Sequence, residues 1–145
     1  MGISDLFLSK NKKLVKRWRA EHEKIVELAN KVIAEYVKNN TSGAKSYMRS
    51  LSSIAADHLA SEDIEFYKLL RDPERNDEVT RDRVKEFEQS FKDIKPTLQK
   101  FLAKYSKDET PLDDEFFDTF NKIVEVLTER IDYEERNLYL RMSLS

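Results

Sequence analysis

Four stretches of the chain repeat apolar residues at steps of three or four, which is the spacing of one face of an α-helix. Charged residues occupy the other positions, and short polar segments separate the stretches. Because connections this short join antiparallel neighbours, the sequence predicts an all-α, antiparallel up-down-up-down four-helix bundle. The predicted helices cover residues 14–36, 48–69, 84–101 and 116–138, and the predicted breaks lie at residues 39–43, 72–77 and 106–111.

Glycine and proline are too scarce to interrupt these helices often, since the 145 residues include only two glycines and three prolines. The length suits one domain with one core. Pro96 lies inside the third pattern and should kink that helix or divide it into two pieces. We expect residues 1–9 to form a short N-terminal cap, in which Leu6–Leu8 cover one end of the bundle, and residues 10–145 to form the bundle itself.

The composition argues against several classes of function. The 26 Lys and Arg residues nearly cancel the 28 Asp and Glu residues, so the net charge gives no support to nucleic-acid binding. The absence of cysteine removes disulfides, thiolate ligands, iron–sulfur clusters and thiol nucleophiles together, and it fits a reducing cytosol. No apolar run approaches the roughly 18 residues that a membrane helix needs, so we expect no membrane association.

Ionisable side chains occur on the apolar stripes, where burial without a partner costs several kcal/mol. His22 lies on the first stripe, and His58 and Glu62 lie on the second. Glu134 lies on the fourth. With a rise of about 1.5 Å per helical residue, positions equally far from a turn lie at the same height in neighbouring helices. This reasoning places seven residues in one layer at mid-bundle: His22, His58, Glu62, Phe87, Phe91, Arg130 and Glu134.

The layer contains the donors of a metal site. His58 and Glu62 are spaced i, i+4, so two successive helical turns present an imidazole and a carboxylate on one face. With His22 and Glu134 they offer two nitrogen and two oxygen ligands, a set that suits iron, manganese or zinc. Arg130 offers a metal-free alternative, because its guanidinium can pair bidentately with either glutamate. On the residues alone, both interpretations stay open.

Three motifs resemble those of the hemerythrin-type domains, also called HHE cation-binding domains. They are the pair Glu21-His22, the segment Asp57–Asp63 and the segment Arg130–Tyr139, within a resemblance that covers roughly residues 10–141. The resemblance implies a four-helix bundle with a carboxylate-bridged di-iron site. Four residues match the family's ligands: His22, His58, Glu62 and Glu134.

The same resemblance implies that part of the di-iron site is lost. The family takes one or two histidine ligands from its third helix, where Phe87 and Phe91 occupy the corresponding positions, and Arg130 replaces the fourth-helix histidine. With only two histidines in the chain, the family's full ligand set is impossible, and we do not expect reversible dioxygen binding by two irons. What remains is a site for one iron, manganese or zinc ion, or a metal-free site in which Arg130 supplies the positive charge.

A second, weaker resemblance is to the bacterial Rsd/AlgQ proteins, which regulate the primary sigma factor of RNA polymerase. It rests on the helix start Lys-Leu-Val-Lys-Arg-Trp at residues 13–18 and on the spacing within residues 57–67 and 130–135. This resemblance implies a metal-free interaction module whose partner is a protein such as a sigma factor.

Taken together, these features predict a cytoplasmic protein of bacterial type that binds metal and has a metal-sensing, redox-sensing or regulatory role. The alternative is the metal-free module that regulates a protein partner. We expect no enzyme activity, because no nucleophile with its base is visible in the sequence. A polar layer walled by phenylalanine also leaves little room for a substrate.

Overall fold

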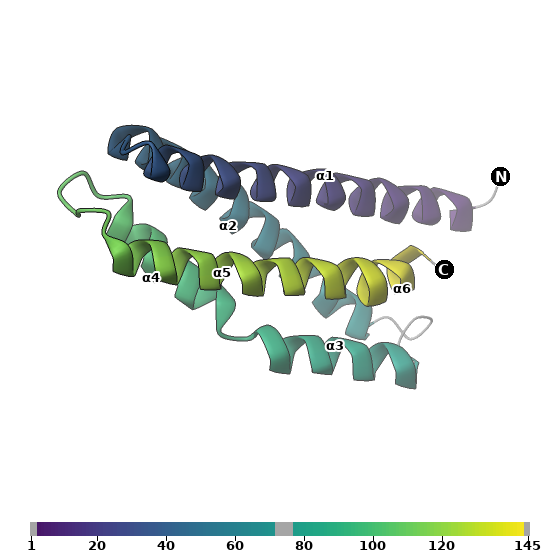
Figure 1. Ribbon diagram of the computed structural model, residues 1–145. Helices are drawn as coiled ribbons and strands as arrows, with labels where there is room; N and C mark the ends of the chain where they lie inside the picture. Colours follow the sequence, from purple (N-terminus) through teal and green to yellow (C-terminus); the bar gives the residue numbers. More distant parts are fainter. Residues whose placement is uncertain (1–2, 72–76, 144–145) are drawn as a thin grey trace.

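The computed structural model describes the backbone of residues 3–71 and 77–143 and the side chains of residues 11–71 and 77–142, and these residues contain no β-strand. Successive long helices reverse direction (Figure 1), so the predicted all-α antiparallel four-helix bundle is confirmed. The helical elements are α1 (Ile3–Val37), α2 (Thr41–Arg71), α3 (Glu78–Phe91), α4 (Ile94–Tyr105), α5 (Asp114–Tyr133), η1 (Glu134–Leu138) and α6 (Tyr139–Ser143).

The third and fourth helices of the bundle are each built from more than one element. Lys92 and Asp93 separate α3 from α4, and Pro96 lies in the first turn of α4, where its missing N–H costs no helical hydrogen bond. The predicted division of this helix near the proline is therefore confirmed. Elements α5, η1 and α6 follow one another without a gap and form one continuous rod, in which η1 is a π-helical turn.

Short polar residues fix where the helices begin and end. Asn39 follows α1 in the left-handed conformation, with φ of 61°, which asparagine tolerates better than most residues. Asp77 caps α3 by accepting a hydrogen bond from the backbone N–H of Thr80 at 2.6 Å. Asp113 caps α5 in the same way, with Phe116 as the donor at 2.9 Å. Local side chains thus set the lengths of the helices that carry the polar layer.

The connections lie at the predicted breaks where the structure describes them, except that residues 41–43 of the first predicted break form the first turn of α2. Loops lie at residues 38–40 and 106–113, while most of the predicted break at residues 72–77 lies outside the described residues. Residues 3–9 continue α1, and the side chains of residues 1–10 lie outside the described set, so the covering of the bundle end stays a prediction. No helix in the described part of the chain is long and apolar enough to span a membrane.

Two apolar clusters fill the bundle, and a polar layer separates them. On α1, His22 lies between Trp18 of one cluster and Ile25 of the other. On the fourth helix, the layer follows Leu127 of the first cluster and precedes Leu138 of the second. Five ionisable residues are buried in this layer: His22, His58, Glu62, Arg130 and Glu134. The layer that the helix heights predicted is therefore present.

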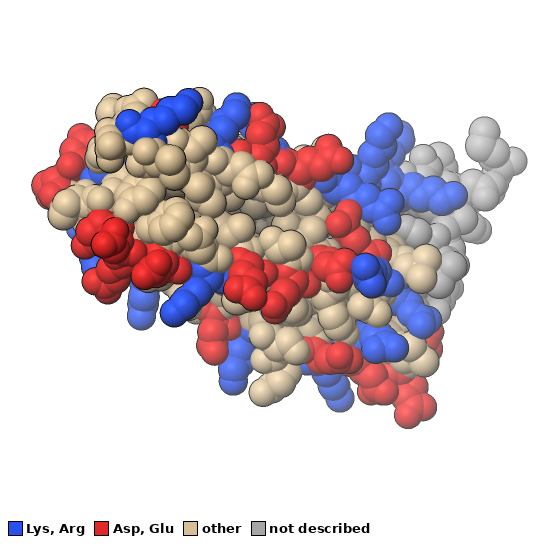
Figure 2. All heavy atoms as spheres, viewed as in Figure 1, with Lys and Arg blue, Asp and Glu red and all other residues tan. Residues whose placement is uncertain are grey.

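The surface of the bundle carries both signs of charge. Figure 2 shows acidic and basic side chains intermixed on the face in view. The exposed large apolar residues among those described are spread over four helices, and they are Val26, Val37, Ile64, Tyr67, Val79 and Leu140. The most unusual feature of the described residues is therefore the buried polar layer.

Candidate metal centre

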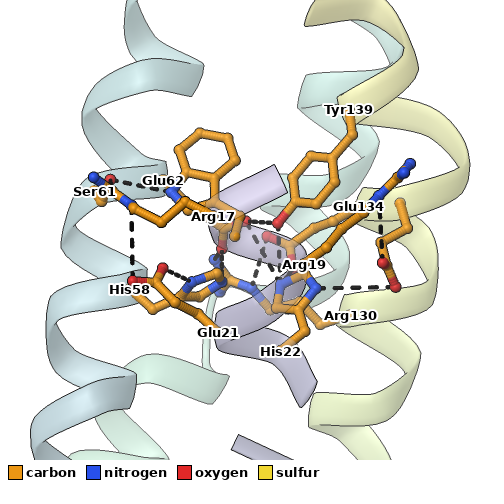
Figure 3. Close-up of polar contacts among 12 residues, drawn as sticks. Arg17, Arg19, Glu21, His22, His58, Ser61, Glu62, Arg130, Glu134 and Tyr139 are labelled. Carbon is orange, nitrogen blue, oxygen red and sulfur yellow. Dashed lines mark hydrogen bonds and ion pairs between the residues drawn. The ribbon is translucent and has the colours of Figure 1, made fainter. Parts of the chain in front are cut away.

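The four predicted ligands lie together inside the bundle (Figure 3). His22 comes from α1, and His58 and Glu62 come from successive turns of α2. Glu134 opens the π-turn η1. One ligand atom from each residue lies within 4.8 Å of one from every other, and all four residues are at most 3% exposed. The structure thus brings together all four residues that the sequence indicated.

Both imidazoles turn one ring nitrogen toward the carboxylates. His58 Nε2 lies 3.1 Å from Glu62 Oε1, and this contact follows from the i, i+4 spacing in α2. His22 Nε2 lies 3.4 Å from Glu134 Oε1 and 3.9 Å from Glu62 Oε2. Glu62 therefore reaches both histidines, one with each carboxylate oxygen.

A further carboxylate lies at the outer nitrogen of each imidazole. Glu21 Oε1 accepts a hydrogen bond from His58 Nδ1 at 2.8 Å, and Glu135 Oε2 lies 3.9 Å from His22 Nδ1. Both glutamates are partly exposed and pair with surface arginines. Histidine ligands of metals usually donate their second N–H to a carboxylate, which fixes the tautomer and the ring orientation. The arrangement at His58 matches that pattern, and neither glutamate was among the predicted site residues.

Arg130 lies beside both carboxylates without chelating either. Its Nη2 is 3.7 Å from Glu62 Oε1, and its Nε is 3.8 Å from Glu134 Oε2. These are ion-pair distances, longer than the bidentate hydrogen bonds that the metal-free alternative assumed. The guanidinium carbon lies 4.7 Å from the ring centroid of Phe87, and Phe91 packs against that ring. The guanidinium of Arg130 and the rings of Phe87 and Phe91 therefore occupy the positions at which the sequence predicted that metal ligands are missing.

Tyr139 is a site residue that sequence reasoning missed. Its hydroxyl is fully buried, donates to Glu62 Oε2 at 2.5 Å and lies 3.0 Å from His22 Nε2. The π-turn brings it here, because the backbone N–H of Tyr139 bonds to the carbonyl of Glu134, five residues earlier. A regular helical repeat places Leu138 on the buried face and does not indicate that Tyr139 is buried. The sequence carries no clear signal of the π-turn that would have revealed the tyrosine.

The two histidines have opposite pKa shifts. Burial, together with the charge of His58, lowers the pKa of His22 to about 4, so His22 is neutral at physiological pH. Burial also acts to lower the pKa of His58, but the carboxylates of Glu62 and Glu21 outweigh it and raise that pKa. His22 therefore needs no net loss of a proton to bind an ion, while His58 holds its proton more tightly than an unperturbed histidine.

The two buried carboxyl groups differ in the same way. Burial raises the pKa of Glu134 well above its ordinary value, and the adjacent Glu62 adds to this increase. Burial acts in the same direction on Glu62, but contacts with Glu134, His58 and Tyr139 overcome it and lower the pKa of Glu62 to about 2. The pKa values of the two carboxyl groups are thus shifted in opposite directions, as expected for two acids in one buried site.

Hydrogen bonding leaves part of this layer unsatisfied. Among the described residues, six buried side-chain nitrogen or oxygen atoms have no hydrogen-bond partner in the protein, and only one of them, Ser106 Oγ, lies outside the layer. The other five are His22 Nδ1, His58 Nε2, Glu62 Oε1, Arg130 Nε and Glu134 Oε2. Such atoms are costly to bury, so each requires an explanation. An ion held by His58, Glu62 and Glu134 would satisfy three of them.

A cavity of about 20 Å³ lies against these atoms. Apolar side chains form its other wall: Ile25, Ala55, Leu59, Leu127 and Ile131. This volume suits a guest about the size of one water molecule. Two imidazole nitrogens and two carboxylates are ligands that iron, manganese and zinc accept. The residues present therefore fit a single metal ion.

The fold and this donor set define a four-helix bundle with a buried candidate metal centre. Comparison with known protein families matches residues 13–141 to the Hemerythrin HHE cation binding domain. Because the match covers most of the chain, the protein belongs to the hemerythrin HHE cation-binding family, and its domain is a metal-binding one. Searches among curated proteins and among solved structures found no match. The similarity to the Rsd/AlgQ proteins stays a prediction.

Arg130 should stabilise the fold when no metal is bound. Arg130→Met keeps most of the side-chain volume over Phe87 but removes the cation beside the two carboxylates. We expect the free energy of unfolding, measured by urea denaturation of chelator-treated protein, to fall by about 3–5 kcal/mol, as when one partner of a buried ion pair is removed. Arg136→Met, on the same helix with a side chain 77% exposed, should change it by less than about 0.5 kcal/mol. Equal stability of the two variants would show that the guanidinium does not compensate the buried carboxylates.

Glu21 should strengthen metal binding without touching the ion. Glu21→Gln keeps the size of the side chain but removes the charge that orients His58 through Nδ1. We expect the affinity for zinc, measured by calorimetric titration, to fall about 10–100-fold. Glu23→Gln changes an exposed residue of the same helix and should bind like the wild type. If both variants bind equally well, Glu21 does not position the histidine.

Metal binding should release protons. The raised pKa values of His58 and Glu134 mean that both hold their protons to higher pH than an unperturbed histidine or glutamate, and both must lose them to act as ligands. The Kd for zinc should therefore decrease as the pH rises toward mildly alkaline values. Calorimetry in buffers of different ionisation enthalpy counts the protons released. A Kd independent of pH, with no proton release, would contradict the assigned protonation states.

Proposed function

We propose that this protein binds one metal ion, iron in the first instance and manganese or zinc as alternatives, and that occupancy of the site serves metal sensing, redox sensing or regulation. One observation carries the proposal, which is a buried set of four donors, each with one side-chain atom that has no hydrogen-bond partner in the protein. A bundle keeps such a set at a cost in stability unless an ion completes it. The donors are His22, His58, Glu62 and Glu134. Membership of a cation-binding family supports the same conclusion.

The choice of one ion over two follows from which ligands remain. His22 and His58 serve one metal position, together with the carboxylates. At the second position Arg130 already places a positive charge 3.7–3.8 Å from both carboxylates, and Phe87 lies against it. A second ion there would meet a guanidinium and find no imidazole. The carboxylates would therefore bridge one metal ion and one arginine.

Binding and sensing suit the site better than catalysis. The cavity of about 20 Å³ has room for little more than a water molecule, and apolar side chains close one side of it. Organic substrates need pockets more than ten times larger, of about 300 Å³ and above. We therefore expect no enzyme activity. We also place the protein in the cytoplasm, a proposal supported by its lack of cysteine.

A metal-free interaction module is the second candidate. Arg130 favours it, because the guanidinium gives Glu62 and Glu134 a positive charge without any ion. Such a module would act through a protein partner, and the similarity to the Rsd/AlgQ proteins suggests a sigma factor. In this case the buried layer would serve only to define the fold.

Metal content distinguishes the two candidates. Untagged protein from iron-supplemented cells should carry close to one equivalent of metal per chain, measured by plasma mass spectrometry. His58→Ala should lose the metal, and Asp57→Ala, which changes the exposed neighbour, should keep it. A chelator should lower the Tm of the wild type, because an ion that binds only the native state stabilises that state. Metal far below one equivalent, with a Tm that the chelator leaves unchanged, would refute metal binding and favour the interaction module.

A further inference from the structure

Tyr139 is held tightly inside the candidate metal centre. Its ring stacks on the imidazole of His22, with 13° between the ring planes, and it also packs against Trp18. The indole N–H of Trp18 donates to Ser61 Oγ at 3.1 Å, which fixes that wall of the site. The phenol oxygen is therefore kept between two of the proposed ligands (Figure 3).

Three atoms form a small triangle at this point. Tyr139 Oη is 2.5 Å from Glu62 Oε2 and 3.0 Å from His22 Nε2, and those two atoms are 3.9 Å apart. Metal–nitrogen and metal–oxygen bonds of about 2.0–2.2 Å place an ion that binds both atoms between them. An ion in that place lies within bonding reach of the phenol oxygen. It must therefore take this oxygen as a ligand or push the tyrosine aside.

Packing opposes displacement of the tyrosine. Tyr139 is fully buried, and the same apolar cluster holds Trp18, Phe66 and Leu138 around it. Because protein interiors are close-packed, the ring of Tyr139 cannot move aside without displacing several neighbouring side chains. The hydrogen bond from the Tyr139 N–H to the carbonyl of Glu134 also ties its backbone to a proposed ligand. The phenol oxygen therefore stays beside His22 Nε2 and Glu62 Oε2, within reach of an ion that binds both of these atoms.

We infer that Tyr139 is a further ligand, whose phenolate oxygen joins two imidazoles and two carboxylates around the metal ion. The inference rests on the proposed metal binding. Burial and the neighbouring carboxylates of Glu134 and Glu62 raise the pKa of the Tyr139 phenol, so the proton would leave only when an ion binds. On ligation the phenol O–H bond breaks, a metal–oxygen bond forms and the proton leaves to solvent, while no electron is transferred. Phenolate is an established ligand of iron in proteins. Tyr139 is thus assigned a role that no repeat in the sequence indicated.

This ligand would make the site favour ferric over ferrous iron. Phenolate is an anionic oxygen donor, and it binds the more highly charged ferric ion more strongly than the ferrous ion. With Glu62 and Glu134 it supplies three anionic side chains to one ion.

The spectrum of the iron-loaded protein tests the inference. Phenolate bound to ferric iron gives a visible charge-transfer absorption, and excitation in this band enhances the Raman vibrations of the coordinated ring. Wild-type protein loaded with ferric iron should show both signals. Tyr139→Phe keeps the stacked ring and should lose both signals while it still binds iron. Tyr105→Phe, which changes a buried tyrosine of the other apolar cluster, should keep both.

The outcomes separate this inference from the proposed function. One equivalent of bound ferric iron without phenolate vibrations would overturn the role of Tyr139 and leave metal binding intact. A Tyr139→Phe variant that keeps the visible band would have the same consequence. Failure of the wild type to bind iron or zinc at all would overturn both proposals. If Tyr139→Phe does not fold, the Raman spectrum of the iron-loaded wild type decides alone.

Discussion

The polar layer at mid-bundle constrains everything else in this molecule. Apolar clusters on either side of it provide the favourable free energy of burial, and the layer opposes them with five ionisable side chains. The protonation of these side chains limits the free-energy cost of burying them. Burial lowers the pKa of His22 and raises that of Glu134, which favours the neutral form of both, and the carboxylate of Glu62 lies beside His58 and Arg130. What stays unsatisfied is a few atoms beside one small cavity, which is where an ion would act.

Arg130 gives one side of the polar layer a permanent positive charge. The resemblance to the hemerythrin-type domains implies two metal positions, and at one of them this chain has the guanidinium of Arg130, a cation that is part of the chain. A permanent guanidinium beside Glu62 and Glu134 reduces the repulsion between them whether or not an ion is present. The bundle can therefore stay folded in both states. A sensor needs two folded states, and a site that required metal to fold would provide only one.

The fold and the four donors were predictable because they depend on pattern. Apolar periodicity defines the helices, and His22, His58 and Glu62 stand out because each breaks an apolar stripe. Tyr139 does not stand out, because an aromatic residue close to a stripe breaks no pattern. Its position depends on the π-turn, which shifts the helical repeat by one residue. Glu21 is equally inconspicuous, since its role depends on the direction that one surface side chain takes.

The contacts that Arg130 makes could not be predicted from the sequence either. The residue was predicted to lie beside the two glutamates, and it does. Whether it chelates one of them or stands between both is decided by differences of less than 1 Å, which follow from its packing on Phe87 and not from helix heights. Sequence spacing places residues to within about one helical turn, roughly 5 Å, so it selects the members of a site but not its hydrogen bonds.

The tautomer of His22 links the centre to the surface. The hydroxyl of Tyr139 donates its only proton to Glu62, so the 3.0 Å contact with His22 Nε2 requires that nitrogen to carry a proton and donate it. An ion bound at Nε2 requires the other tautomer, with the proton on Nδ1, which faces Glu135 at 3.9 Å. Glu135 in turn pairs with Arg19 on α1 at 3.6 Å. An ion bound at Nε2 would thus add a hydrogen-bond donor beside a surface ion pair between α1 and η1, so occupancy of the enclosed site would change a contact at the surface.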